Sequence, residues 1–131
     1  MPPALSAGRL IETEGGKAVI DEKRRVIQEY VPGKQVTLAH VICNPRRELC
    51  DRIGVDNHGA IGVMTITPGE GAVIAADIAG KAAPVHLEFV DRFTGCLMVT
   101  GDVSSVERAL DATVGALQSL LGFYPAGITR S

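Results

Sequence analysis

The chain has 131 residues and a formal net charge of −2, with 46% hydrophobic residues and only 4% aromatic ones. This length suits one domain and is too short for two ordinary ones, and no 18-residue apolar run predicts a membrane span. The acidic balance and the lack of aromatic residues interleaved with basic ones speak against a nucleic-acid surface. The N-terminal residues lack the basic and apolar regions of a signal peptide, so we expect a cytoplasmic protein with neither nucleic-acid nor membrane partners.

Residues 1–24 are polar and end in a charged run, and we expect them to form a flexible N-terminal extension. Gly15-Gly16 also suits a two-residue hairpin turn, which leaves a small hairpin open as an alternative. Val26 to Val31 alternates as a strand, and Pro32-Gly33 then turns the chain.

Gln35 to Cys43 is predicted as a second strand, with Val36, Leu38, His40 and Ile42 on one face. Asn44-Pro45 is expected to open a helix that Gly54 ends. His40 lies between two apolar neighbours, which predicts a partly buried, hydrogen-bonded ring.

Ala60 to Thr67 is nearly all apolar, which is typical of a strand covered on both faces or buried at an interface. Thr67 to Glu70 has the T-x-x-E pattern of a capping box, with Pro68 at the first helical position, and the alanine-rich helix runs to about Ala83. Val85 to Val90 alternates, with Leu87 and Phe89 on one face, and the turn Asp91 to Gly95 leads into a return strand, Cys96 to Thr100.

Ser104 to Glu107 matches a second capping box, S-x-x-E, at the start of the most regular helix. Its apolar stripe steps by three and four residues, and Gly122 ends it. The stripe consists of Val106, Leu110, Val114, Leu117 and Leu121. The tail from Phe123 begins with aromatic residues and is expected to lie against the body. The predicted fold class is α/β, an α+β sandwich in which helices pack on an antiparallel sheet.

Motifs for catalysis or cofactors are missing from the sequence, which has no GxSxG, P-loop, GxGxxG or HExxH. Glu70 and Asp77 share a helical face and could act as an acid–base pair, but a cap and a surface contact explain them more simply. Lys81 is best explained as a surface lysine, and His86 as a surface or interface residue. Cys43, Cys50 and Cys96 are expected to be small buried hydrophobes, because their spacing gives no support to a metal site shared between subunits. We therefore expect no catalytic residue, no metal and no cofactor.

Several blocks of the chain resemble one known family. AIGVMTITPGE (60–70), GKAAPVHLEFV (80–90) and GDVSSVERALDATVGAL (101–117) resemble the body of a bacterial microcompartment shell protein. VTLAHVICNPRRELCDRIG (36–54) resembles the strand and helix that end the conventional family order, here moved to the front. The stretch from Val26 to Ser131 is therefore similar to the circularly permuted, single-domain shell proteins of ethanolamine- and propanediol-utilising microcompartments.

This resemblance implies a homohexamer that tiles into a protein shell with other shell proteins and acts in structure rather than catalysis. Encapsulated enzymes are further implied partners, and the shell lies in the cytoplasm. The domain would span residues 25–131, with 25–34 as barrel strand and turn. Six copies of one strand would form a parallel β-barrel over the central pore. The implied strand residues are Val26, Ile27, Gln28, Glu29, Tyr30 and Val31.

The resemblance also implies site residues. The loop at the pore would consist of Asp91, Arg92, Phe93, Thr94 and Gly95. Lys81 matches the family's edge lysine, and Asn44 stands where the family has an edge arginine. The rival hypotheses are a small-ligand-binding or regulatory oligomeric α/β domain with an interface pocket near the 91–95 turn, and an enzyme that uses Glu70, Asp77 or His86.

Overall fold

The computed structural model describes residues 13–14, 16–18 and 31–131, in which a five-stranded sheet carries two long helices. The sheet order is β5-β6-β4-β3-β7, formed by His86–Asp91, Cys96–Gly101, Ala60–Thr67, Gln35–Cys43 and Thr129–Arg130. All neighbouring strands are antiparallel except β3 and β7. Thr13–Glu14 (β1) and Gly16–Ala18 (β2) pair antiparallel in a separate two-stranded sheet, but Gly16 lies in β2 and not in the Gly15-Gly16 turn of the hairpin alternative.

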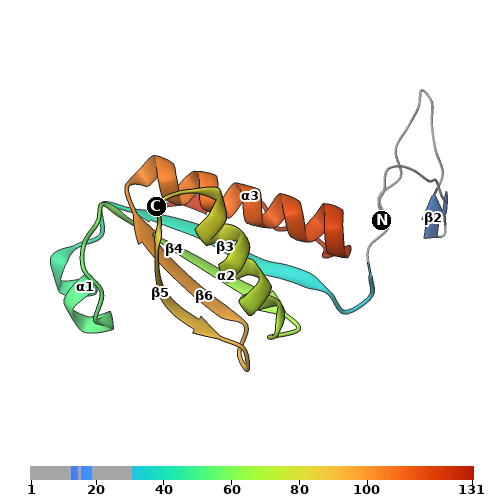
Figure 1. Ribbon diagram of the computed structural model, residues 1–131, viewed down its shortest axis with the longest axis horizontal. Helices are drawn as coiled ribbons and strands as arrows, with labels where there is room; N and C mark the ends of the chain where they lie inside the picture. Colours follow the sequence, from blue (N-terminus) through green and yellow to red (C-terminus); the bar gives the residue numbers. More distant parts are fainter. Residues whose placement is uncertain (1–12, 15, 19–30) are drawn as a thin grey trace.

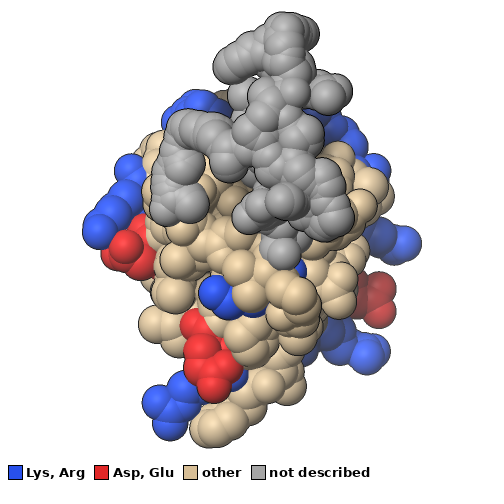
Figure 2. Space-filling model, turned by 90° about the vertical axis from the view of Figure 1, so that its right-hand side faces the viewer, with Lys and Arg blue, Asp and Glu red and all other residues tan. Residues whose placement is uncertain are grey.

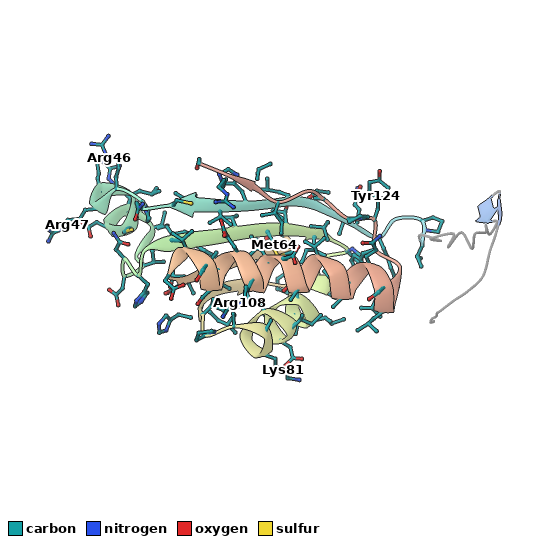
Figure 3. The ribbon with its side chains drawn as sticks, turned by 90° about the horizontal axis from the view of Figure 1, so that it is seen from above. Arg46, Arg47, Met64, Lys81, Arg108 and Tyr124 are labelled. Carbon is teal, nitrogen blue, oxygen red and sulfur yellow. The ribbon has the colours of Figure 1, made fainter. Side chains whose placement is uncertain are left out.

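Helices α2 (Gly71–Ala82) and α3 (Val103–Leu121) cover one face of the sheet, as Figures 1 and 3 both show. The short helix α1 (Arg47–Ile53) lies at one end of the sheet. Met64 of the central strand β4 points into the layer between sheet and α3 and is fully buried. β4 is thus a central strand with a neighbour on each side, but helices cover only one of its faces. Val63 and Thr65 on the other face are half-buried, so the predicted coverage of both faces is not seen in the single chain.

Strand β4 contains a glycine where α3 comes closest. A Cβ on Gly62 would lie 2.8 Å from side-chain atoms of both Leu110 and Val106, so a larger residue would force these α3 side chains to shift. The predicted stripe of α3 is confirmed, since Val106, Leu110 and Leu117 are completely buried. The core is thus mainly aliphatic, in keeping with the scarcity of aromatic residues.

The N-terminus of α3 differs from the prediction. Asp102, not Ser104, is the N-cap: its backbone is extended, and its carboxylate accepts a hydrogen bond from the Ser105 amide at 2.8 Å. This bond is the main reason that the pKa of Asp102 is lowered. Asp102 precedes the S-x-x-E pattern, and its carboxylate already accepts a hydrogen bond from a free amide of the first helical turn. Ser104 is therefore not needed as the N-cap and falls inside the helix. Gly122 ends α3 in the left-handed conformation, as predicted.

The predicted starts of α1 and α2 are wrong as well. Asn44 has φ 50°, which is unsuited to an N-cap, and Arg46 takes that position with extended backbone. Helix α2 starts at Gly71 rather than Pro68, because a tight turn satisfies its first amides: Gly71 N donates to Pro68 O at 2.9 Å, and no capping bond from Thr67 forms. Gly54 ends α1 as predicted.

A β-bulge in β3 changes the face on which its side chains lie. The bulge falls between Val36 and Leu38, so Val36, Ala39 and Val41 are buried while Leu38 is exposed. The regular alternation that grouped Leu38 with Val36 is therefore wrong.

The C-terminal tail returns along β3. Phe123 is buried, and strand β7 pairs in parallel with β3. The ring of His40 is fixed by two hydroxyl groups of this tail, with Nδ1 2.6 Å from Thr129 Oγ1 and Nε2 2.8 Å from Ser131 Oγ. Both the tail and the hydrogen-bonded His40 are confirmed.

Candidate functional site

The turn between β5 and β6, residues 91–95, is held by one carboxylate. Asp91 Oδ1 accepts a hydrogen bond from the Phe93 amide at 2.9 Å, and Oδ2 accepts one from the Thr94 hydroxyl at 2.8 Å. The bond from the Phe93 amide, followed by the one from Thr94, holds the pKa of Asp91 below its usual range. The carboxylate therefore organises the loop.

Two glycines seat this turn against the end of β4. Gly95 has φ +80°, and a Cβ there would lie 2.0 Å from Ile66 O. Gly69 packs equally closely, because its Cβ would lie 2.3 Å from Arg92 O. The Ile66 amide also donates to Gly95 O at 2.9 Å. The turn is thus a rigid projection of the sheet, visible at the lower end of the β5–β6 hairpin in Figure 1.

The tip of this turn presents an aromatic ring and a cation. The Phe93 residue is 82% exposed, and the Arg92 guanidinium carbon lies 5.0 Å from the centroid of its ring. This distance fits a cation–π contact. A large apolar side chain held in solvent by a rigid loop indicates a contact surface.

The outer sheet edge is also apolar. Leu87 and Phe89 of β5 are each 49% exposed, and β5 is the last strand of the sheet on its side. A bulge separates the two: Leu87 is opposite Val99 and Phe89 is opposite Met98, so they face opposite sides of the sheet. The predicted grouping on one face is wrong, and apolar surface lies on both sides of this edge.

Lys81 lies on the outer side of α2 and points away from the sheet (Figure 3). Its Nζ is 2.9 Å from Asp77 Oδ2, and both side chains are well exposed. Asp77 is therefore paired with a lysine, while Glu70 is exposed at the start of the helix. Neither arrangement resembles the acid–base pair that the enzyme hypothesis requires.

Asn44 is exposed at the junction of β3 and α1, and its amide donates to Gly59 O at 2.8 Å. Its left-handed backbone explains the residue type, since asparagine tolerates this conformation. Of the proposed barrel strand, residues 26–30 lie outside the described residues. Val31 is exposed, and its amide donates to Gly122 O at 2.9 Å.

The cysteines are separate thiols. Cys50 is buried as expected, whereas Cys43 and Cys96 are only half-buried, which corrects the prediction of three buried residues. Burial, followed by the charge of Asp91, raises the pKa of Cys96. Across residues 31–131 and the short β1–β2 pair, no three His, Cys, Asp or Glu side chains gather where one metal ion could bind them all.

Charged side chains of both signs are mixed on the visible end of the molecule. Figure 2 shows Lys and Arg next to Asp and Glu on the uncovered part of one end, without a face of a single sign. None of the helices in the described part of the chain is long and apolar enough to span a bilayer.

The BMC domain family matches residues 60–126, about half of the chain. Bacterial microcompartment shell protein EutS of Escherichia coli (strain K12) is 56% identical over 110 residues, which cover 84% of this chain and 99% of the relative. The chain belongs to the bacterial microcompartment shell protein family. Shell protein CutR of Streptococcus intermedius is 53% identical over 107 residues, covering 82% of this chain and 92% of the relative.

Solved shell protein structures show the same fold. A structure described as a CutR flat hexamer superposes with a TM-score of 0.74 at 52% identity, covering 82% of this chain and 99% of the other. The family assignment, the mixed α/β architecture and the shell-protein class predicted from the sequence are confirmed. Both relatives are bacterial microcompartment shell proteins. Sequence reasoning missed the stacked pair His58 and His86 and the strand β7, because no local pattern connects residues so far apart in the chain.

Proposed function

We propose that this chain is a structural tile of a bacterial microcompartment shell. It forms a homohexamer and assembles with other shell proteins into the shell, in the bacterial cytoplasm, and it has no catalytic residue. The observation that carries this proposal is the similarity to the CutR flat hexamer, at 52% identity over 99% of that chain.

The apolar edge of β5 supports a cyclic assembly. An edge strand with half-exposed Leu87, Phe89 and Val90 invites pairing or aggregation in a monomer. A closed ring covers the same surface in every copy, so no edge is left open. The proposed subunit contact therefore includes β5.

The order of elements supports a circular permutation. The family match begins at residue 60, so β3 and α1 precede it, although β3 is the direct neighbour of β4 in the sheet. The end of α3 lies beside the start of β3: Val31 N donates to Gly122 O at 2.9 Å, and Tyr124 N donates to Lys34 O at 2.9 Å. A chain that passed directly from α3 into β3 would need only a short connection, which makes the two orders interchangeable in the same fold.

We assign residues 25–131 to the permuted shell domain and residues 1–24 to an extension. The alternating strand of residues 26–31 is too short to be stable alone, and six copies around an axis would give each one two neighbours. This barrel would cap a pore bordered by the turn 91–95, whose rigid, aromatic tip suits a fixed rim.

Removal of residues 1–30 tests the barrel. We expect the truncated protein to stay folded, because residues from 31 onward pair β3 with β4 and with the C-terminal tail. The hexamers should then show an open centre in electron micrographs, against a capped centre for the full chain. Loss of the cooperative thermal transition after truncation would instead place residues 26–30 in the core and contradict the assignment.

Lys81→Ala tests the tile edge. The ion pair with Asp77 is exposed, so its loss should change the free energy of unfolding by only about 0.3–0.5 kcal/mol and leave hexamers intact. If Lys81 contacts the next hexamer, sheets seen by electron microscopy should become smaller or disappear. The matched control is Arg52→Ala, which breaks the equivalent exposed pair with Glu48 on α1. Sheets of normal size from the Lys81 variant would remove this residue from the edge.

A further inference from the structure

We propose that His58 and His86 form a binding site for a late first-row divalent cation of the Ni²⁺, Cu²⁺ and Zn²⁺ class. The two imidazole rings are stacked, with centroids 4.2 Å apart and planes inclined by 21°. They belong to segments that are separated by 28 positions in the sequence, so the fold alone brings them together. The site lies within one chain and does not depend on the proposed hexamer.

The strand register explains why the rings meet. Ala60, the first residue of β4, is opposite Gly101, and the neighbouring Thr100 is opposite His86. His58 lies two residues before Ala60, so it comes to the same end of the sheet as the start of β5. The pairing of three adjacent strands thus fixes both backbone positions.

The loop that carries His58 is held on both sides of this residue. Asn57 Oδ1 accepts a hydrogen bond from the Gly59 amide at 2.9 Å, and Asn57 Nδ2 donates to Pro45 O at 3.4 Å. The Gly59 carbonyl also accepts the Asn44 amide at 2.8 Å. The backbone of His58 is therefore preorganised, which reduces the entropy lost when its ring binds a cation.

The spacing of the rings suits two ligands of one ion. Two imidazole nitrogens bound at about 2.1 Å to one tetrahedral ion lie about 3.4 Å apart. The ring centroids are 4.2 Å apart and the rings are nearly parallel, so a small rotation of the side chains must bring the in-plane nitrogen lone pairs onto one ion. Both side chains are exposed, so side-chain rotation can turn the ring nitrogens toward one ion without disturbing the core. Imidazole favours late transition metals over Mg²⁺ or Ca²⁺, and water would complete the coordination.

The third histidine of the chain provides the control. Both ring nitrogens of His40 are already within hydrogen-bond distance of hydroxyl groups, those of Thr129 and Ser131. A cation therefore has no open ring nitrogen at His40, whereas no hydrogen bond to another described residue engages the rings of His58 and His86. A comparison of variants at the three histidines therefore distinguishes binding at the His58–His86 pair from a general affinity of the cation for any histidine ring.

The test is a Ni²⁺ titration of untagged, full-length protein by isothermal calorimetry, with His58→Gln, His86→Gln and His40→Gln as variants. We expect one Ni²⁺ per chain, with an affinity that falls about tenfold or more in either of the first two variants, because the second ligand no longer acts at high effective concentration. His40→Gln should bind as the native chain does, and circular dichroism will verify that each variant is folded. Absence of saturable binding to the native chain, or equal affinity in all three variants, would overturn the proposal.

Discussion

Gly95→Ala is expected to be among the most destabilising single substitutions in the described part of the chain. Gly95 has φ +80°, where an L-residue costs about 1–2 kcal/mol in backbone strain alone. Its Cβ would also lie 2.0 Å from Ile66 O, and the bond from the Ile66 amide prevents the two segments from separating. We expect a total loss of about 4 kcal/mol or more, which is exceptional for one substitution and a large part of typical domain stability. Urea unfolding followed by circular dichroism measures it.

Gly54→Ala is the matched control for this prediction. Gly54 has nearly the same backbone, φ +77°, but nothing lies within 4 Å of the position that a Cβ would take. It should therefore show only the strain of about 1–2 kcal/mol. If both substitutions reduce the free energy of unfolding equally, the turn 91–95 is not packed on β4 as described.

Replacing both Leu87 and Phe89 with aspartate is expected to convert the hexamer into monomers. Each side chain is half-exposed in the single chain, so the fold should tolerate the change. In the proposed ring the same positions are covered, and burial of an unpaired carboxylate costs several kcal/mol at each of them. Because the contact repeats around the ring, the penalty applies to every subunit interface. Sedimentation velocity should show a shift from a hexamer to a species near 13.8 kDa.

Leu49→Asp serves as the control for the edge variant. Leu49 is an exposed apolar residue on α1, the short helix at one end of the sheet, and not on strand β5. It should leave the hexamer unchanged. A double β5 variant that still sediments as a hexamer would show that β5 is not a subunit contact, and thermal unfolding of both variants will exclude misfolding as the cause of any change.

The sequence predicts those parts of the fold in which one local pattern dominates. The apolar run of β4 and the regular stripe of α3 identify their elements because burial repeats with the period of the backbone. Gly54 and Gly122 mark helix ends because few other residues accept the left-handed conformation. These signals need no knowledge of distant residues.

The helix starts and the strand phases are less predictable for a physical reason. Two segments match the capping-box pattern, but neither forms the predicted cap. Asp102 is the N-cap of α3, and a tight turn before Gly71 satisfies the first amides of α2. Bulges beside Leu38 and Leu87 shift the alternation by one residue, and nothing in the local sequence marks them. Such features depend on which partner strand or competing acceptor the chain meets after folding.

The candidate site shows the same division. The family resemblance assigned the turn 91–95 and Lys81, and the structure adds the reasons for their shape: the Asp91 hydrogen bonds and the close packing of Gly95. The stacked rings of His58 and His86 had no sequence signal, because only strand pairing brings them together. Contacts between segments that are distant in the chain are thus the features of the candidate site that only the structure reveals.

Native mass tests the central claim most directly. Multi-angle light scattering of the full-length protein at moderate salt should give about 83 kDa, six times the 13.8 kDa of one chain. Such a mass would agree with the ring proposed from the similarity to the CutR flat hexamer. A monodisperse monomer or dimer would contradict the proposed tile.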